Sequence, residues 1–213
     1  MAIPARVERE KLCDLMIEVG PDAPTLCGDW TTRDLAAHLV VRERRPDGAI
    51  GILVKPLAGH AENVRLHEAQ RDYAEIVERV RSGPPRLSPM RPAPIERFVN
   101  TIEYFVHHED VRRGADGWDV RELDDDLLHD LRGPFHRGVK MLARKSPVGL
   151  TLQPDGEDAM VVKKAADGQP VVTVSGPLGE LVLFMYGRQD HTKVEAEGPA
   201  DAVEAVRTAS FGI

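Results

Sequence analysis

The sequence has few cysteines and no excess of positive charge, and each shortage excludes a class of protein. Only Cys13 and Cys27 occur among 213 residues. A disulfide-rich secreted scaffold is therefore excluded, although the sequence leaves a single bridge open. The spacing of the two cysteines fits no zinc motif, and we predict reduced structural thiols. Lys and Arg number 28 against 35 Asp and Glu, a formal net charge of −7, which disfavours a nucleic-acid-binding surface.

Long apolar runs are also missing. No stretch approaches the roughly 20 apolar residues that a membrane-spanning helix needs. The first residues, MAIPARVEREKLC, are charged from the sixth position onward and lack the apolar core of a signal peptide. We therefore predict a cytoplasmic protein that binds neither membranes nor nucleic acid. No oligomeric state follows from the sequence.

Helical patterns dominate the first two thirds of the chain. Apolar residues at spacings of three and four predict an amphipathic helix that ends at Gly20-Pro21. Thr31 stands three residues before Asp34, which is typical of a helix start, and this second helix should run to about Arg44. The segments that follow are predicted to be a loop (44–52), a third helix (60–81), an extended proline-rich crossover (82–94) and a fourth helix (95–113).

The sequence pattern changes near residue 146. Residues 122–145 predict a further helix, interrupted or kinked at Gly133-Pro134. Three valine-rich runs between 148 and 175 predict an antiparallel meander, and a helix, a strand and a closing helix are expected at 177–186, 193–198 and 201–209. The fold class is therefore α followed by α+β. We predict a helical domain at 1–146 and a small α+β domain at 147–213.

Polar side chains lie on the apolar faces of two predicted helices. Glu103, His107 and Asp110 share the apolar face of the fourth helix, and His38 and Arg42 share that of the second. An ionised carboxylate in a core costs several kcal/mol unless it is paired or binds a cation. Glu103 and His107 should stack about 6 Å apart. A histidine from a facing helix would then complete three ligands of a metal site with an open fourth position.

Two ordinary explanations of this pattern stay open. His38 could be a hydrogen-bonded core histidine, and Glu103 could pair with Arg42 or another arginine in a buried salt bridge. Spacing does not establish that the second and fourth helices face each other.

Two segments in a fixed order carry a resemblance to a known family. WTTRDLAAHL, followed later by IEYFVHHEDV, resembles the mycothiol-dependent maleylpyruvate isomerases, which belong to the DinB-like metalloproteins. GPLGELVLFMYGRQD is similar to a family segment that ends in Gly-Arg, and the resemblance covers nearly the whole chain. It implies a DinB-like four-helix bundle followed by a small α+β domain resembling sterol-carrier proteins. It is closest to an actinobacterial subgroup described as metal-binding, so the isomerase's own substrate is not implied.

The resemblance also implies roles for particular residues. By position, His38, Glu103 and His107 match the family's metal ligands. Asp110 matches an acidic residue that would orient a ligand or accept a proton, with a solvated helix charge or an N–H partner as the alternative. Arg188 matches an arginine that would hold a substrate carboxylate from the second domain, with a surface salt bridge as the alternative.

The function that this resemblance implies depends on the open metal position. A metal there can bind a thiol, lower its pKa and hold the thiolate as a nucleophile. We therefore expect a metal-dependent transferase or isomerase that uses a low-molecular-weight thiol, mycothiol, on a small electrophile. Arg42 and Arg188 are the candidate cofactor-binding residues. Zinc is the expected metal, although two nitrogens and one carboxylate also suit nickel, iron, cobalt or manganese.

Two other functions stay open. One is a metal-binding protein without turnover, such as a ligand or stress binder. The other is a carrier of an apolar ligand in the C-terminal domain, for which the metal site would be structural.

Overall fold

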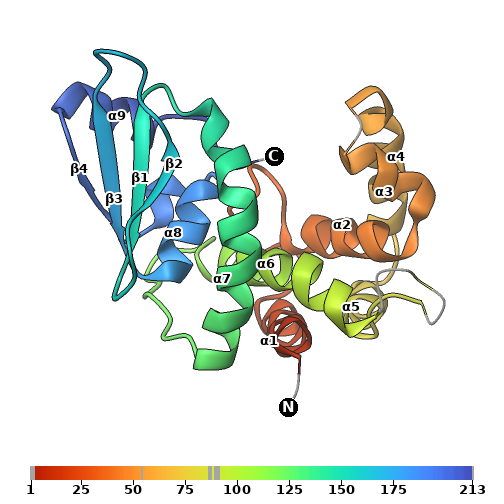
Figure 1. Cartoon of the computed structure of the whole chain (residues 1–213). Helices are drawn as coiled ribbons and strands as arrows, with labels where there is room; N and C mark the ends of the chain where they lie inside the picture. The colour runs from red at the N-terminus through yellow and green to blue at the C-terminus, as the bar shows by residue number, and fades with distance from the viewer. Residues whose placement is uncertain (1–2, 54, 86–87, 89–91, 213) are drawn as a thin grey trace. The chain divides into compact units, whose positions relative to one another are not determined.

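The computed structural model describes residues 3–53, 55–85, 88 and 92–212. The chain forms two compact units, Met1–Trp118 and Asp119–Ile213. Helices build the first unit, and helices with a four-stranded mixed sheet build the second (Figure 1). The boundary predicted at residue 146 lies 28 residues after the boundary between these units at residue 118. The prediction assigned residues 119–146 to the helical part, whereas the structure groups them with the sheet. The limits of independently folding domains stay a prediction.

The first unit begins with the helices that the sequence predicted best. Its elements are α1 (Pro4–Val19), α2 (Thr32–Arg44), α3 (Pro46–Leu53), a 3-10 turn (Lys55–Leu57), α4 (Ala58–Ala69), α5 (Tyr73–Arg81) and α6 (Ala93–Arg112). α1 ends before Gly20, whose φ of +84° suits a residue without a side chain. At the start of α2, the Thr31 amide and hydroxyl donate to Asp34 Oδ2 over 3.1 and 2.9 Å.

The predicted loop at 44–52 is wrong, because most of it forms α3. Pro46 is the first residue of this helix, where its missing N–H costs no hydrogen bond, and Asp47 lies favourably in the first turn. Gly48 lets α3 pack closely against α2 and α4 and does not form a turn. A Cβ at this position would lie 2.6 Å from a Val41 methyl carbon of α2 and 3.2 Å from one of Val64 in α4.

The predicted third helix at 60–81 is also wrong, because α4 and α5 are separate helices. The Asp72 carboxylate caps α5 by accepting a hydrogen bond from the Glu75 amide over 3.2 Å. The Tyr73 hydroxyl then donates to the Met16 carbonyl over 2.8 Å and ties the start of α5 to α1. The predicted crossover at 82–94 lies partly outside the described residues, and α6 begins close to its expected start.

The core of the first unit gathers side chains from α1, α2, α5 and α6. Leu12 and Met16 of α1 and Leu35 of α2 are fully buried there, against Tyr104 of α6. Burial of such side chains stabilises a fold by about 1.5–3 kcal/mol each. This shared core positions α2 relative to α6, and therefore positions the polar side chains beside it.

The sheet of the second unit is not the predicted meander. Its strands are β1 (Gly149–Pro154), β2 (Met160–Lys163), β3 (Val171–Gly176) and β4 (Glu195–Glu197), in the spatial order β2-β1-β3-β4. β1 pairs antiparallel with β2 but parallel with β3. Leu150 and Leu152 of β1 are fully buried, as are Val172 and Val174, their partners in β3. Packing of this apolar centre accounts for β3 joining the far edge of β1.

Helices complete the second unit. They are α7 (Asp125–Leu142), α8 (Leu178–Met185) and α9 (Ala200–Arg207), and α8 and α9 lie where the sequence placed them. α7 runs through Pro134 without an interruption, and a kink at Gly133-Pro134 stays a prediction. Its buried face, Leu131, Phe135 and Val139, continues across the proline, and this packing offsets the roughly 3 kcal/mol that an internal proline costs. Within the described part of the chain, no helix is long and apolar enough to cross a membrane.

Candidate metal centre

Helices α2 and α6 bring three of the predicted ligands together. Glu103 Oε1 lies 3.3 Å from His107 Nε2 and 3.7 Å from His38 Nε2. The three ligand atoms all lie within 4.8 Å of one another. In a tetrahedral zinc site, bonds of about 2.0–2.1 Å place neighbouring nitrogen and oxygen ligands about 3.4 Å apart. The spacing therefore suits a cation with small side-chain adjustments.

Solvent reaches all three side chains of this cluster. The exposed side-chain fractions are 14% for His38, 25% for Glu103 and 12% for His107. Three converging ligands with a solvent-facing side are typical of a site that keeps one position for water or a small ligand. A closed structural site would instead bury four protein ligands.

Arg42 contacts the same carboxylate oxygen. Its Nε lies 3.0 Å from Glu103 Oε1, and its Nη1 donates to Asn100 Oδ1 over 2.8 Å. The salt bridge considered from the sequence is therefore present. It is compatible with a metal, because each carboxylate oxygen accepts more than one bond, and a fixed guanidinium would orient Glu103. A direct cofactor contact for Arg42 stays a prediction.

Asp110 holds the other side of His107. It is fully buried, and its Oδ2 lies 2.9 Å from His107 Nδ1. Because an ionised carboxylate only accepts, Nδ1 carries the proton and donates it to Asp110. Once the proton on Nε2 has left, Nε2 would point a lone pair toward Glu103 and His38, as in metal-binding histidines oriented by a carboxylate. Asp110 is thus no solvated surface charge.

The charges of the cluster shift three pKa values. Burial alone would raise the pKa of Glu103, but Arg42 and hydrogen bonds from both histidines outweigh it and hold that pKa well below its usual range. Burial also lowers the pKa of His38. For His107, burial is outweighed by hydrogen bonds to Asp110, Cys27 and Glu103, which raise its pKa well above the usual value. Without a cation, these contacts therefore favour the imidazolium form of His107, protonated on both nitrogens.

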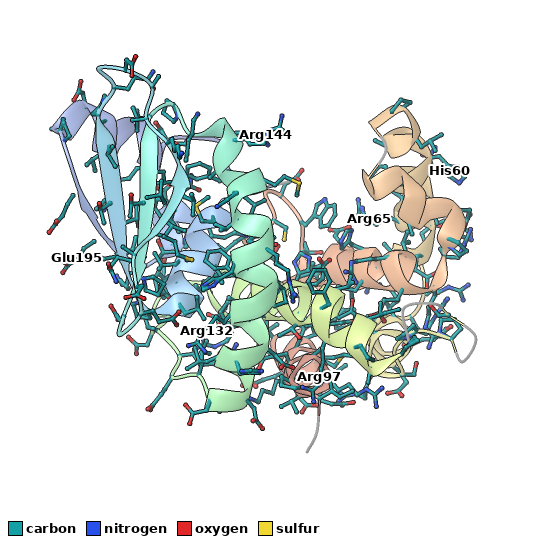
Figure 2. The ribbon with its side chains drawn as sticks, in the orientation of Figure 1. His60, Arg65, Arg97, Arg132, Arg144 and Glu195 are labelled. Atoms are coloured by element: carbon teal, nitrogen blue, oxygen red, sulfur yellow. The ribbon has the colours of Figure 1, made fainter. Side chains whose placement is uncertain are left out.

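An aromatic ring closes one side of the cluster. The Trp30 ring lies 5.3 Å from the His38 ring, centroid to centroid, and Arg65 of α4 lies over the same indole at 4.7 Å. Arg65, labelled in Figure 2, also pairs with Asp34 at the start of α2. These contacts pack an indole ring held by Arg65 against the His38 ring. His60, also labelled there, is exposed and lies near Asp47.

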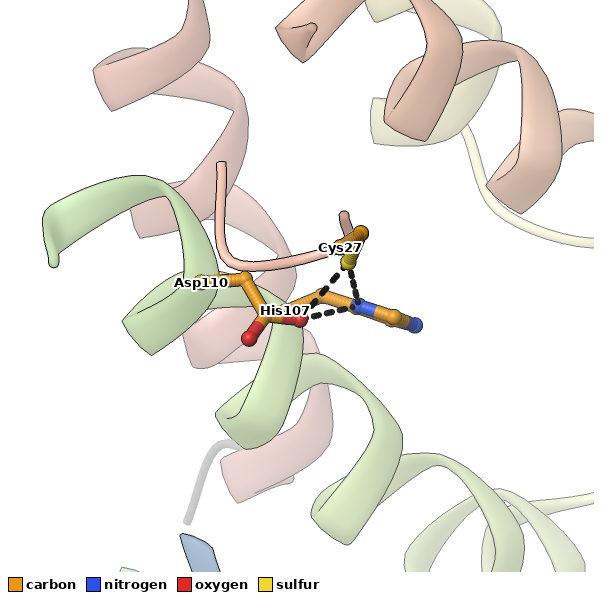
Figure 3. Close-up of side chains that lie close together, drawn as sticks. All are labelled: Cys27, His107 and Asp110. Atoms are coloured by element: carbon orange, nitrogen blue, oxygen red, sulfur yellow. Dashed lines mark hydrogen bonds and ion pairs between the residues drawn. The ribbon is translucent and has the colours of Figure 1, made fainter. Parts of the chain in front are cut away.

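Cys27 is the site residue that sequence reasoning missed. Its Sγ lies 3.0 Å from Asp110 Oδ2 and 3.8 Å from His107 Nδ1 (Figure 3). Nothing in the cysteine spacing indicates this contact, because a loop ahead of α2 brings the thiol to α6. Cys13 behaves as predicted, since it is buried in the core, where burial raises its pKa to about 12. The two thiols form no disulfide.

Arg188 belongs to the second compact unit. It is partly buried ahead of the 3-10 turn Gln189–His191, and its Nη1 donates to the Tyr186 carbonyl over 2.5 Å. Its role toward a substrate or cofactor stays a prediction.

Comparisons with known proteins agree with this architecture at the level of the fold. No family model and no curated protein matches the chain. Among solved structures, the chain is similar to the crystal structure of the mycothiol-dependent maleylpyruvate isomerase, with a TM-score of 0.55 over 91% of this chain and 90% of that one. The two sequences are 16% identical. The chain therefore shares the fold of a mycothiol-dependent maleylpyruvate isomerase.

Proposed function

We propose that His38, Glu103 and His107 bind one divalent metal that activates a low-molecular-weight thiol toward a small electrophile. The observation that carries this proposal is the convergence of Nε2, Oε1 and Nε2 from two helices, on side chains that solvent partly reaches. Zinc is the metal we propose, because two imidazoles and a carboxylate around an open position match its catalytic sites.

The chain's own residues would hold the reacting groups. Bound at these three atoms, a divalent metal would lower the pKa of a thiol in its open position and keep it as a thiolate. Asp110 would fix the His107 tautomer through Nδ1, and Arg42 would keep Glu103 Oε1 oriented toward the site. Before a metal binds, the proton on His107 must leave Nε2 for solvent, because a ligating nitrogen must be unprotonated.

The identity of the thiol is the finer part of the proposal. We propose mycothiol, supported by the shared fold with an isomerase that depends on mycothiol and by the order of the two helical motifs. The same proposal includes a DinB-like four-helix bundle for the helical part and a sterol-carrier-like α+β domain, as in the actinobacterial metal-binding subgroup. It also assigns carboxylate binding to Arg188. The electrophile is defined only by its class.

Metal binding and thiol chemistry are separable, and their tests differ. Metal content is measured first by plasma mass spectrometry, on untagged protein. Turnover is then measured with metal-loaded protein, mycothiol and a panel of small electrophiles. Thiol consumption that His38→Ala abolishes, and that the exposed-histidine control His60→Ala retains, supports the enzyme. A loaded protein that binds metal but consumes no thiol with any electrophile would leave a metal-binding protein without turnover.

A further inference from the structure

A second group of metal-ligand atoms shares His107. Cys27 Sγ, His107 Nδ1 and Asp110 Oδ2 all lie within 4.8 Å of one another (Figure 3). They meet at Nδ1 of the imidazole, whereas Glu103 lies next to Nε2. Sulfur is 3.0 Å from the carboxylate oxygen and 3.8 Å from the nitrogen. With bonds of about 2.3 Å to sulfur and 2.0–2.2 Å to nitrogen or oxygen, a tetrahedral ion separates sulfur from the other ligands by about 3.5 Å. The observed spacing brackets that value.

Backbone contacts fix the position of the thiol. The Leu26 amide donates to the Asp110 carbonyl over 3.1 Å, which ties the loop to α6. The Thr25 hydroxyl accepts from the Cys27 amide over 3.1 Å and donates to the Trp30 carbonyl over 2.7 Å. Gly114 leaves room for this loop, because a side chain there would collide with the Pro24 carbonyl. The sulfur is therefore placed in advance, as ligands of a metal site are.

The same geometry argues against an acid–base role for the thiol. A cysteine nucleophile needs a histidine that faces the thiol with one nitrogen and an orienting carboxylate with the other. Here the thiol and Asp110 both face Nδ1, and the thiol donates its hydrogen bond to Asp110. His107 therefore cannot accept the thiol proton at one nitrogen while Asp110 orients the ring at the other. The three atoms instead converge as ligands.

We infer that Cys27, His107 Nδ1 and Asp110 form a second cation site, one that takes a thiophilic ion such as Cd²⁺ or Cu⁺. A thiolate selects such ions over hard cations. The cation replaces the thiol proton and the proton on Nδ1, both of which pass to solvent, and no group is oxidised or reduced. Because a neutral imidazole offers one lone pair, a cation at Nδ1 places the proton on Nε2, where it points to Glu103. The two sites therefore exclude each other.

Cadmium binding tests this inference. Metal-free protein is titrated with Cd²⁺ while thiolate-to-cadmium charge-transfer absorption is followed in the ultraviolet, and bound cadmium is counted by equilibrium dialysis. Wild-type protein, Cys13→Ala and His38→Ala are expected to bind about one equivalent and to show the charge-transfer band. Cys27→Ser is expected to lose the band and to bind cadmium at least tenfold more weakly.

Three results would overturn the inference. They are a wild-type protein without the band, a band that persists in Cys27→Ser, and two equivalents bound at once, which would contradict mutual exclusion. Native circular dichroism of Cys27→Ser shows that this variant is folded, whether or not the first site binds zinc. Because His38→Ala removes a ligand of the first site only, the cadmium band and the zinc content can fail separately, so failure of this inference is distinguishable from failure of the proposed function.

Discussion

Replacing Asp110 with asparagine tests whether the buried carboxylate orients a metal ligand. The variant Asp110→Asn keeps the size of the side chain and an acceptor oxygen, but it loses the charge that holds the Nδ1 proton of His107 across 2.9 Å. Loss of such a partner typically weakens metal binding by about 10- to 100-fold, or roughly 1.4–2.8 kcal/mol. The hydrogen bond to this carboxylate also raises the pKa of His107. In the variant, a smaller fraction of His107 should therefore carry the proton that competes with the metal at neutral pH.

The two effects have opposite signs, and pH separates them. Zinc affinity is measured by competition with a chromophoric chelator at pH 7 and again at about pH 8.5, where proton competition is weaker. We expect a larger loss of affinity at the higher pH. Asp14→Asn, which changes an exposed carboxylate on α1, is the matched control and should bind zinc as the wild type does. An unchanged affinity of Asp110→Asn at both pH values would refute the orienting role of Asp110.

Three further predictions concern the metal, its pH dependence and the packing of α3. Plasma mass spectrometry should find about one equivalent of metal in the wild-type protein and in the control His60→Ala. The ligand variants His38→Ala and Glu103→Gln should lose this metal. If both ligand variants kept the metal and had native circular dichroism, the assigned ligands would be wrong. Because the pKa of His107 is raised above its usual value, zinc uptake at pH 7 should release about one proton, and affinity should rise with pH until that pKa is passed. Calorimetry in two buffers of different ionisation enthalpy measures this release, and no difference between them would count against it. Gly48→Ala should lower thermal stability by about 1–3 kcal/mol, because the added Cβ would lie 2.6 Å from a Val41 methyl carbon, whereas Gly59→Ala, with open space around the residue, should not.

Local patterns in the sequence were enough to predict the helices that carry the site. The end of α1 and the start of α2 depend on residues within one helical turn, Gly20 in one case and Thr31 with Asp34 in the other. The stacking of Glu103 and His107 follows from the 3.6-residue turn of one helix. Such features need no knowledge of the rest of the chain. The antiparallel meander failed because β3 pairs with the far edge of β1, a long-range contact. The loop over α3 and the single helix over 60–81 failed because local helix-start signals, Pro46 with Asp47 and the Asp72 cap, were overlooked.

The sequence by itself determined that a carboxylate and a histidine share one face of α6, and that the chain carries no basic excess. Only the tertiary structure decided that His38 faces them, that Arg42 shares the Glu103 oxygen, and that Cys27 reaches Asp110. It also decided that β3 runs parallel to β1. The physical reason is that periodicity is a property of one segment, whereas these contacts join segments far apart in the chain, and their geometry is set by how the core packs.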